Sequence, residues 1–167
     1  MSTPSVIAEE FLRELEAEAG ATRKCLEQVP MDKPEYKPHE KSMELGYLAL
    51  LVADIPKWIH VIIDKGEIDF ATYEHSSVKT VDELVAHFDE VMEKARTSLK
   101  GFSEDMHDQP FDLKNSGQLL YSTTKRESVS ESINHMVHHR GQLSVYLRLN
   151  DKPVPSIYGP SADDRSF

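Results

Sequence analysis

The stretch Asn134-His135-Met136-Val137-His138-His139-Arg140-Gly141-Gln142-Leu143 holds three of the chain's eight histidines within five residues. It lies inside a long run that is compatible with a helix. His135 and His139 are four residues apart, so on a helix they lie on one face, one turn above the other. At this spacing a helix can offer two imidazoles to one metal ion, but a metal site needs further ligands from elsewhere. The pair therefore predicts half of a metal site.

The helix that carries this stretch is expected from about Thr124 to Leu149, because Asn150, Asp151 and Pro153 follow it. At 100° per residue it separates an apolar arc from an exposed polar arc. Between them lies a polar stripe bordering the core, which we expect to face a cleft between helices: Ser128, Ser132, His135, His139, Gln142 and Tyr146. The alternative is that the two histidines form only a hydrated edge of the bundle.

Two neighbours of the pair have different expected environments. His138 points away from the stripe and is expected on the surface or behind the site. Arg140 projects toward the apolar arc, where a cation needs a carboxylate or a subunit interface. Its possible partners are Glu44, Asp54 and the acidic side of the first helix.

The rest of the chain predicts three more helices. The first spans Ser5 to about Val29, with Ser5 or Thr3 as its N-cap. The second spans about Glu40 to Ile63, is apolar over most of its circumference and contains Pro56, which should kink it. The third follows a Thr80–Glu83 capping box and closes at Gly101.

The remaining long segment, Phe102 to about Leu120, has no helical period and is expected to be a functional or crossover loop. With little strand signal elsewhere, the chain is predicted to be all-α: a single four-helix bundle over residues 1–167, with a long crossover connection.

Composition narrows the function. The net charge of −10 argues against a nucleic-acid partner, and no fully apolar run reaches the length of a membrane span. The start of the chain lacks the features of a secretory signal, and a lone Cys25 cannot form an internal disulfide. We therefore expect a cytoplasmic protein in which Cys25 is a small residue on a helix face.

Three segments resemble the DinB-like family. The stretch 39–49, His-Glu-Lys-Ser-Met-Glu-Leu-Gly-Tyr-Leu-Ala, with 54–58 behind it, is similar to that family's second-helix motif. The stretch 135–143 is similar to the fourth-helix motif, and 145–163 to the C-terminal end. The resemblance spans essentially the whole chain.

The resemblance implies a four-helix bundle, usually a homodimer, in which three histidines hold a divalent metal such as Zn, Ni, Mn or Fe. Two of those ligands correspond to His135 and His139, and the third comes from the second helix. Relatives include thiol-dependent transferases and isomerases, in which the metal would lower the pKa of a low-molecular-weight thiol.

The chain departs from this pattern at the third ligand, where Leu51 stands in place of a histidine. An aliphatic side chain cannot bind a metal. None of the other candidate side chains is a natural replacement for the third histidine: Glu44, Tyr47, Asp54, His60 and His87.

Two hypotheses follow. One is a metal-dependent, thiol-transferase-type enzyme with an incomplete three-histidine site, completed by a non-standard ligand or water. The other is a metal-free relative in which the cleft binds a small molecule or serves only as structure. The sequence leaves open whether the protein is an enzyme.

Overall fold

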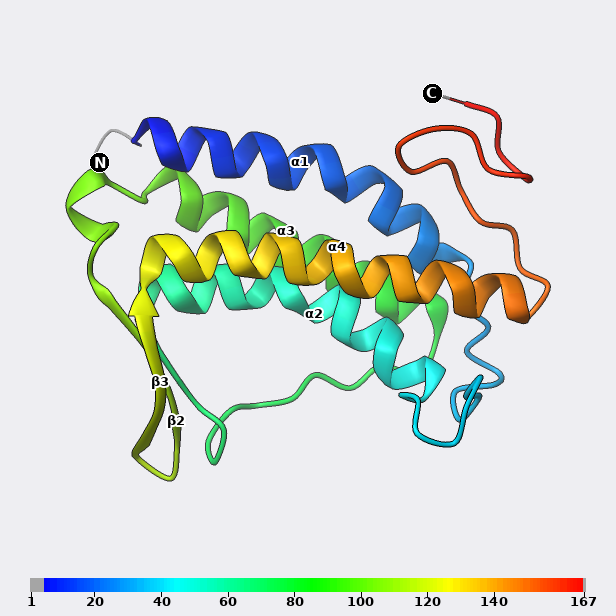
Figure 1. Cartoon of the computed structure of the whole chain (residues 1–167), viewed down its shortest axis with the longest axis horizontal. Coiled ribbons are helices and arrows are strands. Elements are labelled where there is room, and N and C mark those ends of the chain that lie inside the picture. Colours follow the sequence, from blue (N-terminus) through cyan, green and yellow to red (C-terminus); the bar gives the residue numbers. More distant parts are fainter. Residues whose placement is uncertain (1–4, 167) are drawn as a thin grey trace.

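Four long helices run side by side in the computed structural model, which describes residues 5–166. They are α1 (Val6–Glu27), α2 (Leu45–Asp64), α3 (Val81–Lys100) and α4 (Lys125–Leu149). Helices α1 and α2 each pack against both α3 and α4, so α1 and α2 occupy opposite corners of the bundle (Figure 1). The four-helix bundle predicted from the sequence is confirmed.

Three helices begin at side-chain caps. The Ser5 hydroxyl accepts a hydrogen bond from the Ala8 amide at the start of α1, as predicted, whereas Thr3 lies outside the described residues. Both Thr80 before α3 and Thr124 before α4 form complete capping boxes with the glutamate three residues later. These reciprocal bonds satisfy amide groups that a helix start leaves without partners.

Helix α2 begins at Leu45 rather than at about Glu40. The amides of Leu45 and Gly46 donate to the carbonyls of Tyr36 and Pro34, which folds the proline-rich connection back over the helix start. A Cβ on Gly46 would lie 3.0 Å from the Cβ of Pro34, so this close approach depends on glycine.

Pro56 lies inside α2 without ending it, and Figure 1 shows α2 as a bent helix. Among the described residues, α2 alone is long and apolar enough to cross a membrane, although the sequence was expected to hold no such run. Most of its apolar surface is buried inside the bundle, which accounts for that composition.

A small sheet corrects the all-α prediction. Its strands are β1 (Glu67–Asp69), β2 (Pro110–Asn115) and β3 (Gln118–Thr124), in the order β1-β2-β3. Strand β1 pairs in parallel with β2, with Glu67 opposite Asp112, and β2 and β3 form an antiparallel hairpin. The segment expected to be an irregular loop thus holds a 3₁₀ turn (Glu104–Met106) and this hairpin.

The hairpin turn explains why the sheet forms. Ser116 and Gly117 have φ values of 51° and 76°, the left-handed pair that a two-residue hairpin loop requires. Their amides donate to the Asp69 carboxylate over 2.9 and 2.7 Å, which ties the turn to β1. Ile68 and Phe111 are buried and attach the sheet to the bundle.

Candidate functional site

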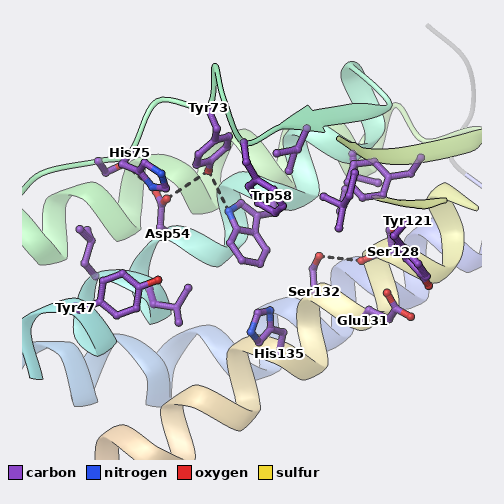
Figure 2. Close-up of a pocket in the computed structure, with 18 residues that line it drawn as sticks. Tyr47, Asp54, Trp58, Tyr73, His75, Tyr121, Ser128, Glu131, Ser132 and His135 are labelled. Carbon is purple, nitrogen blue, oxygen red and sulfur yellow. Dashed lines mark hydrogen bonds between the residues drawn. The ribbon is translucent and has the colours of Figure 1, made fainter. Parts of the chain in front are cut away.

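A cavity of about 580 Å³ lies between α2 and α4, beneath the sheet and the segment 70–79 that follows β1 (Figure 2). We call this segment the strap, and the strap and sheet together the roof. The floor consists of side chains from the two helices: Tyr47, Leu50, Leu51, Asp54, Trp58 and Ile62 of α2, and Ser128, Glu131, Ser132 and His135 of α4. The roof contributes Ile68, Phe70, Tyr73, His75, Ser76, Phe111, Leu113 and Tyr121.

The first half of the polar stripe of α4 borders this cavity, as predicted, whereas His139, Gln142 and Tyr146 are not among the described residues that line it. Ser128, Ser132 and His135 line it. Farther along the helix, the Tyr146 hydroxyl donates to the Met43 carbonyl over 2.9 Å. His138 is exposed, in agreement with its predicted surface position.

His135 and His139 contact each other directly, with 2.7 Å between their Nε2 atoms. His139 Nδ1 lies 2.7 Å from the Gln142 amide oxygen, which can only accept a hydrogen bond. His139 Nδ1 therefore carries the proton, and in the neutral ring its Nε2 accepts from His135 Nε2–H. Burial, together with the neighbouring His139 and His138, lowers the pKa of His135, so this ring is neutral at pH 7.

Two of the three donors expected for a metal are present. The His135 and His139 Nε2 atoms converge closely enough for one ion to take the place of the shared proton. Leu51 lines the cavity with an apolar side chain at the third position. Within residues 5–166, no group of three or more His, Cys, Asp or Glu side chains is arranged to hold a metal ion. The residues present do not complete a three-histidine site, and ligation by this pair stays a prediction.

The other candidates for a third ligand have other partners or lie elsewhere. His60 Nδ1 contacts the Ser98 hydroxyl at 2.9 Å and the Asp64 carboxylate at 3.4 Å, on the side of α2 that faces α3. His87 of α3 contacts Asp54. Glu44 is exposed before α2, and Tyr47, 60% exposed, lies at the cavity rim.

Asp54 ties the strap to the bundle. Its carboxylate accepts hydrogen bonds from His87 Nε2 at 2.8 Å, the Ser76 hydroxyl at 2.9 Å and the Tyr73 hydroxyl at 3.4 Å. Burial alone would raise the pKa of Asp54, but the bonds from His87 and Ser76 and the nearby Lys57 charge hold it below its usual value. Asp54 therefore stays ionised at neutral pH.

Two further contacts from α2 hold the same strap. Trp58 Nε1 donates to the Tyr73 hydroxyl over 3.0 Å, a bond visible in Figure 2. Lys57 Nζ donates to the Glu74 carbonyl over 2.8 Å and lies 4.7 Å from the centre of the Tyr73 ring. The ring of Trp58 also packs against His135, so the strap, Trp58 and the histidine pair form one continuous set of contacts.

Arg140 is buried, and its carboxylate partner comes from the first helix. Its Nη1 lies 2.6 Å from the Glu18 carboxylate and 3.2 Å from the Thr22 hydroxyl, and its Nη2 donates to the Tyr158 hydroxyl over 2.8 Å. Of the partners considered from the sequence, the acidic side of the first helix is correct. Arg140 thus belongs to the bundle core and not to the cavity.

Cys25 has no part in the cavity. It is fully buried on α1, as the sequence reading favoured, and burial raises the pKa of its thiol to about 11. A thiol in this state is a poor nucleophile at neutral pH.

The roof was missed from the sequence. A weak signal was present, since Phe111 and Leu113 alternate with polar residues and the Ser116-Gly117 pair follows within a few positions. The strap, by contrast, has no periodicity, and its contacts with Asp54 and Trp58 join residues 15 to 22 positions apart.

Known proteins share this fold. The DinB family model matches residues 1–165. A DinB-like protein from Bacillus subtilis is 21% identical, with a TM-score of 0.70, over 93% of this chain and 99% of the other. A DinB-like protein from Bacillus cereus is 20% identical, with a TM-score of 0.70, over 90% and 97% of the two chains.

A third solved structure, assigned to the same family and from Exiguobacterium sibiricum, is 16% identical, with a TM-score of 0.66, over 96% of this chain and 98% of the other. No curated protein matches the chain. At these identities the solved structures establish the fold, and the family model, which matches nearly the whole length, establishes the family: the chain belongs to the DinB family.

Proposed function

We propose that this DinB-family protein binds a small, largely apolar molecule in the cavity between α2, α4 and the roof. The observation that carries the proposal is the cavity itself, about 580 Å³ and lined mainly by aliphatic and aromatic side chains with a few polar groups. This volume and lining are typical of small-molecule sites. The metal-free alternative drawn from the sequence is the one that this geometry supports best.

Trp58 provides the test, because it lines the cavity and is the only tryptophan in the chain. We expect its fluorescence to change saturably on titration with 4-phenylbutan-1-ol, a neutral probe that does not absorb at 295 nm. Leu51→Phe, which narrows the cavity, should weaken this binding. Leu12→Phe is the matched control, since Leu12 is half-buried on α1, away from the cavity, and should leave binding unchanged. Absence of saturable binding to the unaltered protein would contradict the proposal.

A second candidate function is the metal-dependent, thiol-transferase-type activity that the family resemblance suggests. It is supported by the 2.7 Å approach of His135 and His139 Nε2 at the edge of the cavity. Metal analysis of protein produced with added Zn and Ni tests it. About one ion per chain, lost on replacing both histidines by alanine, would support this function, and metal-free protein would exclude it.

A further inference from the structure

The polar groups of the cavity floor are unevenly distributed along α4. Ser128, Glu131 and Ser132 lie within little more than one helical turn, and Figure 2 shows them at one end of the cavity, near Tyr121. We call these three residues the polar end. The rest of the floor is largely aliphatic and aromatic, including Leu51 and Trp58. A ligand that fills the cavity therefore has one place for a polar head group next to a long apolar wall.

Ser128 is the clearest sign that the polar end is incomplete without a ligand. The residue is 4% exposed, and its buried hydroxyl oxygen has no hydrogen-bond partner among the residues that the structure describes. Buried polar groups in proteins are nearly always paired, because an unpaired one loses its bonds to water without replacement. A polar atom of a bound molecule at this end would supply the missing bond.

The other two members are acceptors. The Ser132 hydroxyl donates to the Ser128 carbonyl over 2.8 Å, which leaves the lone pairs of its oxygen to accept. Glu131 lies exposed at the rim, and within residues 5–166 it has no ion pair or side-chain hydrogen bond. Two hydroxyl oxygens and an unpaired carboxylate favour a head group that donates hydrogen bonds.

The charge of the cavity lining also favours a head group that donates hydrogen bonds. Among the described residues that line the cavity, Asp54 and Glu131 are acidic and none is a lysine or arginine. Asp54 is already bonded to His87 and Ser76, so Glu131 is the carboxylate left for a ligand. An anionic ligand would meet a carboxylate and no cation, whereas a cation would be attracted to Glu131 and to the aromatic ring faces.

We propose that the ligand is an apolar primary amine, with its ammonium group bound by Ser128, Glu131 and Ser132 and its hydrocarbon body along Leu51 and Trp58. This inference rests on the proposed function, since it specifies the chemical class of molecule that the same cavity takes. It also sets this cavity apart from a site for acidic, low-molecular-weight thiols.

Three probes with one body and different head groups test the inference: 4-phenylbutylamine, 4-phenylbutan-1-ol and 4-phenylbutanoate, each followed by Trp58 fluorescence at pH 7.4. We expect the amine to bind about tenfold more tightly than the carboxylate, with the alcohol between them, since a charge-assisted hydrogen bond is roughly twice as strong as a neutral one. Glu131→Gln should weaken the amine about fivefold, the effect of one partly exposed ion pair, and leave the alcohol unchanged. Glu14→Gln, which removes one exposed carboxylate from α1, is the matched control and should change neither.

Ser128→Ala separates binding from folding. It should weaken the amine and the alcohol about fivefold, the effect of one hydrogen bond, while the melting temperature stays the same or rises because an unpaired buried hydroxyl is removed. If the alcohol binds but the amine binds no more tightly than the carboxylate, the inference is wrong and the proposed cavity function stands. If none of the three probes binds, both fail.

Discussion

The side chain at position 51 of α2 cannot bind a metal ion. Leu51 lines the same cavity as His135 and supplies no donor. We predict that Leu51→His creates a site for one Zn or Ni ion per chain, bound at least tenfold more tightly than by the unaltered protein, because a third imidazole completes the set. Competition with a chromophoric chelator measures the affinity.

Leu50→His is the control for this prediction. Leu50 also lines the cavity, but it lies about 100° away around α2, so its imidazole should not meet the pair. Equal metal affinity in both variants would show that position 51 has no special relation to His135 and His139.

Asp54 gives the protein a pH-dependent contribution to stability. Its pKa is lower in the folded state than in the unfolded chain, so its contribution is complete above about pH 4 and is lost as the pH falls through the folded-state pKa. The groups that face it are His87 of α3, Lys57 of α2, and Tyr73 and Ser76 of the strap. We predict that Asp54→Asn lowers the free energy of unfolding at pH 7 by about 1–3 kcal/mol, the effect of breaking a buried hydrogen-bond set.

Urea unfolding between pH 7 and pH 3 checks this. The difference in free energy of unfolding between Asp54→Asn and the unaltered protein should shrink toward pH 3, because protonation of Asp54 removes the charge that the variant already lacks. Glu14→Gln should show no such convergence. A gap that is constant over the whole pH range would show that the ionised state of Asp54 does not matter.

The roof is less buried than the helices, so we expect its local stability to be lower. Most of β3 is exposed, whereas more than half of α2 is buried. We therefore predict that backbone amides of β3 and the strap exchange with deuterium at least tenfold faster than those in the middle of α2, because local opening of the roof exposes little apolar surface. Hydrogen exchange followed by mass spectrometry checks this, and a bound amine probe should slow exchange in the roof specifically. Equal protection of roof and α2 would contradict the prediction.

The elements that follow from local rules were predicted, and those that depend on distant contacts were not. Helical periodicity predicted α3 and α4, and the capping box at Thr80 also marked the start of α3. The start of α2 was misplaced by about five residues, because hydrogen bonds from Leu45 and Gly46 to Tyr36 and Pro34 of the preceding proline-rich connection determine it. The sheet was missed because Glu67–Asp69 is too short to recognise and its pairing with β2 spans 45 residues.

Part of the candidate site could likewise be predicted from local sequence, and part could not. Spacing along one helix placed Ser128, Ser132 and His135 at a cleft edge, and the structure confirms it. The polar end was not identified as such, because the missing partner of Ser128 appears only once its surroundings are known.

The C-terminal tail matters at the scale of the whole molecule. The Tyr158 hydroxyl accepts from Arg140 and donates to Glu18 over 3.0 Å, and Asp163 pairs with Arg148. The tail thereby covers a buried ion pair that joins α1 to α4. We predict that a chain ending at Lys152 has a free energy of unfolding about 1–3 kcal/mol lower than that of the full chain. The reason is that the Arg140–Glu18 ion pair loses the hydrogen bonds of Tyr158 and becomes more exposed to water.

Chemical unfolding of the truncated chain, compared with Tyr158→Phe, separates the two causes. The single substitution removes only the hydroxyl and should account for about 1 kcal/mol. A truncated chain as stable as the full one would show that the tail does not stabilise the bundle.

The separation of the cavity into floor and roof has a consequence for how ligand preference can change. Floor residues such as Trp58 and Ile62 lie on helices that also form the core, so replacing them disturbs the whole fold. Phe70 and Tyr121 of the roof are about half exposed and lie outside the helices, in the segments that connect α2 to α3 and α3 to α4. Sequence drift in those connections can therefore reshape the upper wall of the cavity while the bundle stays intact, which gives one scaffold a route to different ligands.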